Sequence, residues 1–228
     1  FIQCEKMAHT LRIPLVRMID GTGGGGSVKT LEDIGATYLP ATPGWDMIAR
    51  NLETVPVVAL ALGPTAGLGA ARVVASHYSV MVKGLSQVFA AGPAVVEAIG
   101  EASDKESLGG SEIHTRNGVV DDEVASEAEA FAAARRFLSY LPSSVGEPAP
   151  RTPCSDPVDR REQALLGVVP RDAKQVYSMR QVLSMVFDQG SVFEMGRAWG
   201  RALITAFARL DGRVVAVMAS DPSFLGGS

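Results

Sequence analysis

The sequence predicts an α/β protein in which buried parallel strands alternate with helices. One apolar run, residues 55–62, is continuous and bounded by Pro56 and Gly63, as is typical of a strand covered on both faces. Residues 126–140 carry an apolar stripe at helical spacing, behind a possible capping box of Ser126 and Glu129. This alternation indicates βαβ units with right-handed crossovers.

The remaining elements follow the same periodicities along the chain. Helices are expected at 1–12, 45–52, 68–76, 88–99, 103–108 and 179–187, and strands at 13–19, 79–82, 202–210 and 213–219. Asp211-Gly212 predicts a hairpin between the last two strands. The stretch 141–159 holds five prolines and reads as a linker. We therefore expect a first lobe at 1–142, a linker at 143–158 and the beginning of a second lobe at 159–228.

Composition narrows the class of protein. The 228 residues are 46% hydrophobic and 20% charged, with a formal charge of −4, so nothing favours a nucleic-acid partner. Apolar runs break within about 10 residues, whereas roughly 20 are needed to span a bilayer. Cys4 and Cys154 lie far apart, which favours free thiols over a disulfide, and the scattered histidines predict no metal site. We expect a cytoplasmic protein, or a mitochondrial matrix protein if the source is eukaryotic.

Two glycine-rich segments are candidate ligand sites. The apolar strand at 55–62 runs into Gly63-Pro64-Thr65-Ala66-Gly67-Leu68-Gly69 and then into a helix. Unpaired amides at such a helix start can stabilise an oxyanion, although a tight turn that needs glycine for packing explains the pattern equally well. The run 21–26, which includes Gly23 and Gly24, is either a mobile loop or a backbone wall that a ligand approaches closely.

An ordered set of short segments extends over nearly the whole chain. It comprises Ile13-Pro14-Leu15-Val16, Asp20, Val55-Pro56, Gly63-Pro64, Ala66-Gly67, Met81-Val82-Lys83-Gly84, Gly92-Pro93, Leu108-Gly109-Gly110, His114, Tyr177-Ser178-Met179-Arg180, Asp188, Phe193-Glu194 and Phe207-Ala208-Arg209-Leu210-Asp211-Gly212. In this order and spacing the set resembles the carboxyltransferase (beta) subunits of biotin-dependent acyl-CoA carboxylases, of the propionyl-CoA and acetyl-CoA type. The resemblance implies a crotonase-like fold with one nearly complete N-terminal lobe and the start of a second.

The resemblance also implies site residues. The backbone amides of Gly67 and Leu68 would hold the thioester oxygen of an acyl-CoA. Substrate-binding positions would be Gly23, Gly24, Gly69, Gly92, Pro93, Gly109, Gly110 and His114. The sequence departs from the family at Gly67-Leu68, where two glycines are usual, and at Asp20-Gly21-Thr22-Gly23, where the family has Asp-Ser-Gly-Gly.

The implied reaction needs no side-chain base. Carboxybiotin, carried on a partner domain, would supply both CO2 and a basic ureido nitrogen, and the enolate of the acyl-CoA would attack CO2 while backbone amides hold its oxygen. No metal is implied in this subunit. The implied partners are acyl-CoA, the biotin carboxyl carrier, the biotin carboxylase subunit and further copies of the chain.

Three other functions remain open at this stage. A biotin-dependent acyl-CoA decarboxylase would look similar. A hydratase or isomerase of the same fold would need carboxylates near the turn, and no convincing glutamate pair is present. A truncated module for CoA binding or assembly is the non-catalytic alternative. Because the chain begins at Phe1 in a helical pattern and ends in Gly-Gly-Ser, we expect a truncated piece that is inactive alone.

Several polar residues have both a structural and a functional interpretation. His114 either makes a local hydrogen bond or lines the active site, and Gly92-Pro93 either starts a helix or lines the acyl site. His77 is expected to interact with a helix C-terminus. Asp121, Asp122 and Glu123 are expected to be a solvated run before a helix. Arg135 and Arg136 are expected as surface charges, with contact to CoA phosphate as the alternative.

Overall fold

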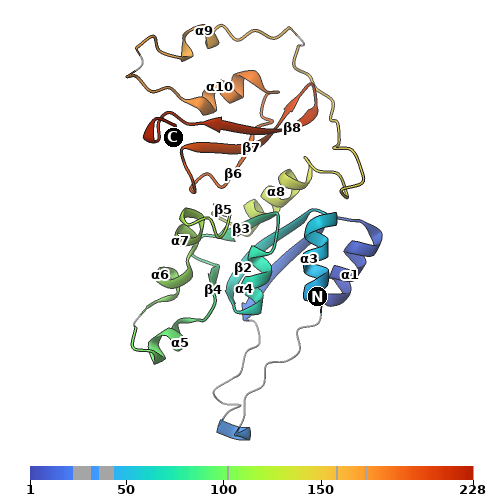
Figure 1. Cartoon of the computed structure of the whole chain (residues 1–228), viewed down its shortest axis with the longest axis vertical. Coiled ribbons are helices and arrows are strands. Elements are labelled where there is room, and N and C mark those ends of the chain that lie inside the picture. The colour runs from blue at the N-terminus through green and yellow to red at the C-terminus, as the bar shows by residue number, and fades with distance from the viewer. Residues whose placement is uncertain (23–31, 36–43, 102, 158, 173, 228) are drawn as a thin grey trace.

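The computed structural model describes residues 1–22, 32–35, 44–101, 103–157, 159–172 and 174–227, and it contains two sheets (Figure 1). The first sheet has the order β1-β2-β3-β5, with β4 also paired to β2, and its pairings are all parallel. The second sheet is antiparallel, in the order β6-β7-β8. The predicted alternation of helices with parallel strands is therefore confirmed.

The first sheet and its helices occupy the N-terminal part. The elements are α1 (Ile2–Leu11), β1 (Leu15–Thr22), α3 (Trp45–Thr54), β2 (Val57–Ala66), α4 (Leu68–Val74), β3 (Tyr78–Val82), β4 (Gln87–Phe89), α5 (Pro93–Ala98), α6 (Lys105–Gly109), α7 (Ser111–Arg116), β5 (Asp122–Val124) and α8 (Glu127–Leu138). The C-terminal part holds α9 (Leu165–Val168), α10 (Met179–Val186), β6 (Phe193–Met195), β7 (Leu203–Leu210), β8 (Arg213–Ser220) and the 3-10 turn η1 (Leu225–Gly227). None of the helices in these described ranges is long and apolar enough to cross a membrane.

Strand β2 is the centre of the fold because both of its faces are buried. Val58 and Leu60 belong to a core cluster that includes residues of α8, while Ala59 and Ala61 belong to a second cluster that includes residues of α4. This two-residue alternation follows from the strand geometry. Helices α8 and α4 thus cover opposite faces of the sheet.

Strand β2 also changes its neighbour along its length. Its first half, Val58 to Ala61, pairs with β3, and its last residues, Pro64 to Ala66, pair with β4. The register with β1 shifts after Ile19, because β2 has extra residues there. Gly63 lies at this irregularity, and a Cβ on it would overlap the side chain of Asp20. The end of β2 is therefore paired with β4, whereas its beginning is paired with β3.

The two sheets share one aromatic core. The rings of Tyr78, Phe137, Tyr140, Phe193 and Phe207 lie 4.9–6.4 Å apart, centroid to centroid, in six pairs. They come from β3, from α8 and the residues just after it, and from the second sheet, so α8 lies between the sheets (Figure 1).

Two arginines reinforce this junction. Arg209 on β7 donates to Ser139 O at 2.7 Å, just after α8. Arg136, expected as a surface charge with contact to CoA phosphate as the alternative, donates to Gly190 O at 3.0 Å and Val192 O at 2.7 Å, which ties α8 to the segment before β6.

Two segments have a structure other than the one assigned to them from the sequence, and α7, α9 and β6 were not predicted at all. Residues 88–99 were expected to be one helix, but Gln87–Phe89 is strand β4 and only Pro93–Ala98 is helical. The acidic run at 121–123 was expected to be a solvated run before a helix, but Asp122–Val124 is strand β5, in which Asp122 is half-buried and only Glu123 is exposed. Both strands are three residues long, so they are too short for a period of two to show. Their pairing with distant strands decides their structure.

Other predictions are confirmed. The hairpin between β7 and β8 turns at Asp211 and Gly212, whose φ values of 51° and 71° match a type I′ turn. Ser126 caps α8 by accepting from Glu129 N at 3.3 Å, although the Glu129 carboxylate accepts from Ala125 N and not from Ser126. Both cysteines are free thiols. The lobe boundaries at 142 and 158 stay a prediction.

Candidate active site

The turn after β2 consists of one residue, Gly67. Strand β2 ends at Ala66 and α4 begins at Leu68. The φ of 58° and ψ of −121° at Gly67 lie in a region that glycine populates readily and other residues do not. A strand-to-helix turn that requires glycine, which the sequence predicted, is therefore present.

The amides at this turn differ in their availability. Gly67 N donates to Phe89 O at 3.0 Å, so it cannot serve as the oxyanion donor that was expected at this position. Leu68 and Gly69 are the first two residues of α4, and no acceptor for their amides occurs within the described ranges. Such unpaired amides are normal in the first turn of a helix. The candidate donors are therefore Leu68 N and Gly69 N.

The far end of α4 is fixed by a buried arginine. Arg17 on β1 donates to the Glu5 carboxylate at 2.8 and 3.2 Å. Its Nη1 also donates to Arg72 O at 3.2 Å and to Ala75 O, which are carbonyls at the C-terminal end of α4. Asn51 donates to the same Glu5 carboxylate at 2.7 Å. The helix that carries the candidate donors is thus anchored to β1 and α1 by a buried cluster in which the Arg17 and Glu5 charges are paired.

The segment α6–α7 packs on β4. His114 on α7 contacts Val88 O through Nε2 at 2.6 Å, so the local hydrogen bond considered for this residue is present. Gly109 is buried, and a Cβ on it would overlap Val88 O and the Phe89 ring. Gly110 forms a bridge with Gln87. These three predicted site residues therefore meet at β4, whose Phe89 O accepts from Gly67 N.

The other predicted site residues are spread more widely. Gly92 is the N-cap and Pro93 the first residue of α5, which fits the helix-start interpretation. That they line an acyl site stays a prediction. Gly69 is buried in the first turn of α4. Gly23 and Gly24 lie outside the described residues.

His77 has the helix-end contact that was expected, but with another helix. Its Nε2 lies 2.9 Å from Leu52 O, in the last turn of α3, and its Nδ1 accepts from Val57 N at 3.0 Å. His77 therefore joins the end of α3 to the start of β2.

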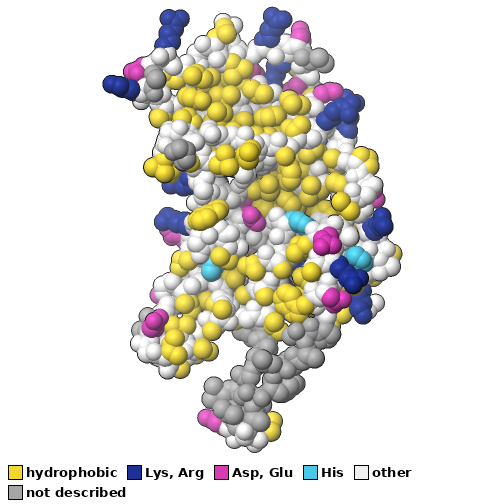
Figure 2. Space-filling view, in the orientation of Figure 1, with side chains coloured by type: hydrophobic (Ala, Val, Ile, Leu, Met, Phe, Trp, Pro, Cys, Tyr) yellow, Lys and Arg dark blue, Asp and Glu magenta, His cyan; other side chains and the backbone are white. Residues whose placement is uncertain are grey.

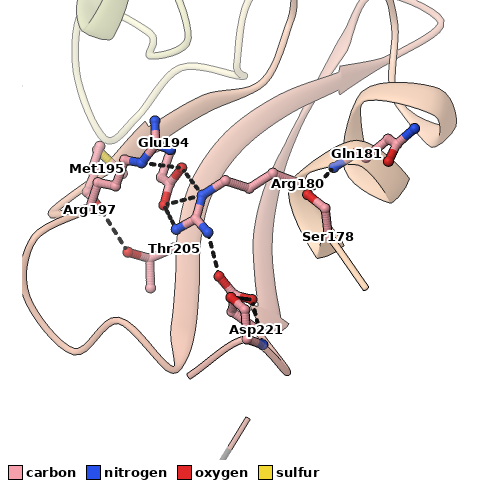
Figure 3. Close-up of polar contacts among 9 residues, drawn as sticks. Ser178, Arg180, Gln181, Glu194, Met195, Arg197, Thr205 and Asp221 are labelled. Carbon is pink, nitrogen blue, oxygen red and sulfur yellow. Dashed lines mark hydrogen bonds and ion pairs between the residues drawn. The ribbon is translucent and has the colours of Figure 1, made fainter. Parts of the chain in front are cut away.

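A charged cluster near the second sheet was not predicted (Figure 3). Arg180 on α10 binds the Glu194 carboxylate with Nε at 2.8 Å and Nη2 at 2.6 Å, and it also donates to Asp221. Ser223 N donates to the other oxygen of Asp221 at 3.0 Å. The Glu194 hydrogen bonds raise the pKa of Arg180. Arg180 and Glu194 lie in segments of the family resemblance, which gave them no role because their pairing is visible only in three dimensions.

A second unpredicted feature is the pair formed by Tyr78 and Asp122. Tyr78 donates through its hydroxyl to Asp122 Oδ2 at 2.8 Å. Burial raises the pKa of Asp122 to about 6, although the hydrogen bond from Tyr78 opposes this shift. Burial also raises the pKa of Tyr78. Asp122, expected to be solvated, is therefore a partly buried carboxyl beside the aromatic core.

Asp122 and Arg180 both face a cavity of about 740 Å³ between the two sheets. Its walls also include Lys83, Arg197 and Arg201. Most of the cations are paired within the chain, as Arg180 is with Glu194 and Lys83 is with Glu123. Residues of the Gly67 turn are not among the lining residues, so the cavity is separate from the candidate donors.

The chain is similar to known proteins over nearly its whole length. The model of the carboxyl transferase domain family matches residues 3–228. The mitochondrial propionyl-CoA carboxylase beta chain of Mus musculus is 32% identical over 231 residues, which cover 98% of this chain and 41% of the mouse protein. The methylmalonyl-CoA decarboxylase subunit alpha of Veillonella parvula is 28% identical and covered over 44% of its length. This chain thus spans about two fifths of these relatives.

Solved structures agree with the sequence comparisons. The transcarboxylase 12S structure, a hexamer with hydrolysed methylmalonyl-coenzyme A bound, superimposes with a TM-score of 0.84 at 26% identity, over 99% of this chain and 43% of that one. A single-chain, multi-domain long-chain acyl-CoA carboxylase superimposes with a TM-score of 0.80 at 25% identity. These neighbours confirm the predicted crotonase-like α/β class. The chain belongs to the carboxyl transferase domain family.

Proposed function

We propose that this chain is part of a carboxyltransferase that moves a carboxyl group from carboxybiotin to the α-carbon of an acyl-CoA, propionyl-CoA or one of similar size. The observation that carries the proposal is the Gly67 turn. Among the residues that the structure describes, it leaves the amides of Leu68 and Gly69 unpaired at the end of a strand that is buried on both faces. The family membership of the chain supports the same reaction.

The two amides suit a thioester enolate. Proton removal from the α-carbon places negative charge on the thioester oxygen, and preorganised backbone donors stabilise that charge without reorganising during the reaction. A single donor of this kind contributes about 3–4 kcal/mol to lowering the barrier. The anchoring of α4 by Arg17 keeps both donors in place.

The turn supplies no acid or base of its own. Residues 63–70 contain no ionisable side chain, and their one hydroxyl, on Thr65, is buried and donates to Gly63 O at 3.1 Å. Carboxybiotin, when bound, supplies both the carboxyl group and the base through its ureido group. A site that offers only backbone donors fits a reaction in which the cofactor brings the base.

The partners follow from this reaction. We propose that the complete protein binds a biotin carboxyl carrier, works with a biotin carboxylase subunit and assembles with further copies of itself. The description of transcarboxylase 12S as a hexamer supports assembly. A decarboxylating carboxyltransferase is the second candidate, and the likeness to a methylmalonyl-CoA decarboxylase subunit favours it.

Substitution of Leu68 tests the proposal. Leu68 is the first residue of α4, where proline is tolerated in a helix, so Leu68→Pro removes one amide donor and leaves the helix able to form. In the complete carboxylase, with methylmalonyl-CoA and free biotin, we expect this variant to form propionyl-CoA about 10²–10³-fold more slowly. Leu68→Ala, which keeps the amide, should remain within about threefold of the parent.

The variant and the parent protein test two different claims, the donor assignment and the carboxyltransferase function. Unchanged turnover in Leu68→Pro would refute the donor assignment. Absence of biotin-dependent turnover in the parent protein would refute the carboxyltransferase function itself. Biotin-independent decarboxylation would favour another enzyme of the same fold, and binding of propionyl-CoA without any turnover would favour the non-catalytic module.

A further inference from the structure

Strand β4 sets the orientation of the Gly67 peptide. Its three residues pair with the last residues of β2, Val88 with Thr65 and Phe89 with Ala66. Phe89 O then accepts from Gly67 N at 3.0 Å, one residue beyond the strand pairing. Gly67 directly precedes the two candidate donors. A displacement of Phe89 O would therefore also change the positions of the Leu68 and Gly69 amides.

His114 holds β4 from the side opposite to β2. Its Nε2 lies 2.6 Å from Val88 O, and because a carbonyl oxygen can only accept, Nε2 carries the hydrogen. Its Nδ1 is buried and has no hydrogen-bond partner within the described part of the chain. The ring is therefore used through one nitrogen only, as a donor to β4.

Gly109 brings α6 close enough for this contact. A Cβ at position 109 would overlap both Val88 O and the ring of Phe89, so the end of α6 lies directly on the peptide that His114 holds. Gln87, the residue before, pairs with Gly110 and donates to Glu106 on α6. Helices α6 and α7 thus contact all three residues of β4. Glu106 of α6 and Gly110 bind Gln87, His114 binds Val88 O, and Gly109 packs on the ring of Phe89.

We infer that His114 and Gly109 are positioning residues, which act on the reaction through Val88 and Phe89 and not by touching the acyl-CoA. The inference rests on the proposed function, and it replaces the substrate-binding role that the family resemblance implied for both residues. A positioning role predicts a loss of rate without a loss of binding, because the donors are displaced while the contacts to the rest of the acyl-CoA remain.

The kinetic test uses the complete carboxylase. His114→Leu removes the donor, and His114→Gln offers an amide N–H in its place. We expect His114→Leu to lower kcat about tenfold or more with KM for propionyl-CoA within about threefold, and His114→Gln to restore most of kcat. Gly109→Ala should also lower kcat selectively. The matched control is Gly167→Ala on α9, where a Cβ meets nothing within 4 Å, and it should leave both constants unchanged.

An exchange measurement tests the same link without catalysis. In this chain, hydrogen–deuterium exchange of the peptide that contains Gly67 should be faster in His114→Leu than in the parent and near the parent rate in His114→Gln. A rise in KM at constant kcat would identify His114 as a substrate contact and overturn the inference. Unchanged Gly67 exchange in His114→Leu would overturn it too, even if the carboxyltransferase function holds. Faster exchange in a protein without carboxyl transfer would refute the function and leave the structural link standing.

Discussion

The two sheets differ in how they are covered. The first is parallel, and β2 at its centre has helices on both faces, with its first five residues fully buried. The second is antiparallel, and in β8 exposed and less exposed residues largely alternate. Toward the C-terminal end of β8, Met218 is 76% exposed. Figure 2 shows hydrophobic side chains gathered over the part of the molecule that carries the second sheet and α10.

The two sheets therefore differ in how firmly their residues are packed and in how far they are exposed to solvent. The candidate donors follow β2, whose first five residues are fully buried, and close packing there fixes the backbone to within a small tolerance. One face of the second sheet packs on α8 through Phe207 and Val214, but the far end of that face leaves Leu203 and Met218 exposed. The first sheet is therefore suited to hold a reacting group, whereas this end of the second sheet is open to solvent.

The largest expected effect concerns the charge cluster of the first sheet. Only 2% of the Arg17 side chain and 4% of the Glu5 side chain is exposed. Arg17→Ala would leave the buried Glu5 carboxylate without its counter-charge, bonded only by Asn51, and two helix carbonyls without their arginine donor, and we expect it to lower the free energy of unfolding by about 3–5 kcal/mol. Urea denaturation of the chain measures this loss.

The matched substitution near the second sheet is Arg180→Ala. Its side chain is 30% exposed, and Asp221 keeps two hydrogen bonds from Ser223, so water and these bonds offset part of the loss. We expect a decrease of about 1–2 kcal/mol. Equal losses in the two variants would contradict the proposed difference between the sheets.

An effect of about the same size, but dependent on pH, is expected where the sheets meet. The pKa of Asp122 is raised from 3.8 to about 6, so the folded state favours the protonated carboxyl. The stability that this group contributes is fully present below about pH 4 and is lost as the pH rises through about 6. Asp122→Asn stays neutral, and it should gain about 1–2 kcal/mol relative to the parent between pH 4 and pH 7. Thermal unfolding at several pH values measures the gain, and a constant difference across the range would show that Asp122 is not shifted.

The smallest effect is expected at the exposed end of the second sheet. Met218→Ser replaces an exposed apolar side chain and should change the free energy of unfolding by less than about 0.5 kcal/mol. A loss above about 2 kcal/mol in the isolated chain would mean that this end is already covered, for instance by self-association. Analytical ultracentrifugation of the parent and the variant distinguishes the two cases.

Much of the fold could be predicted because its elements have strong local signals. The continuous apolar run of β2, the Ser126 cap of α8 and the Asp211-Gly212 turn each act within a few residues. Strands β4 and β5 could not be predicted. Three residues carry no readable period, and the acidic residue Asp122 in β5 is stabilised by Tyr78, 44 residues earlier in the chain.

The candidate site shows the same limit. The need for glycine at position 67 could be predicted from the strand-to-helix junction alone. That Gly67 N is already bonded could not, because its acceptor, Phe89 O, belongs to the strand that the sequence failed to indicate. Arg17 looked like one residue of an apolar strand run, and its hold on the end of α4 depends on contacts more than 50 residues away in the sequence.

Because β2 changes its partner along its length, the part paired with β4 can shift without disturbing the part paired with β3. Val58 to Ala61 pair with β3, whereas Pro64 to Ala66 pair with β4. A substitution or an insertion in the α5–α6 region can therefore shift β4 while the β3 ladder keeps its hydrogen bonds. A scaffold built in this way can change the backbone around Gly67 and still fold around the same pairing of β2 with β3.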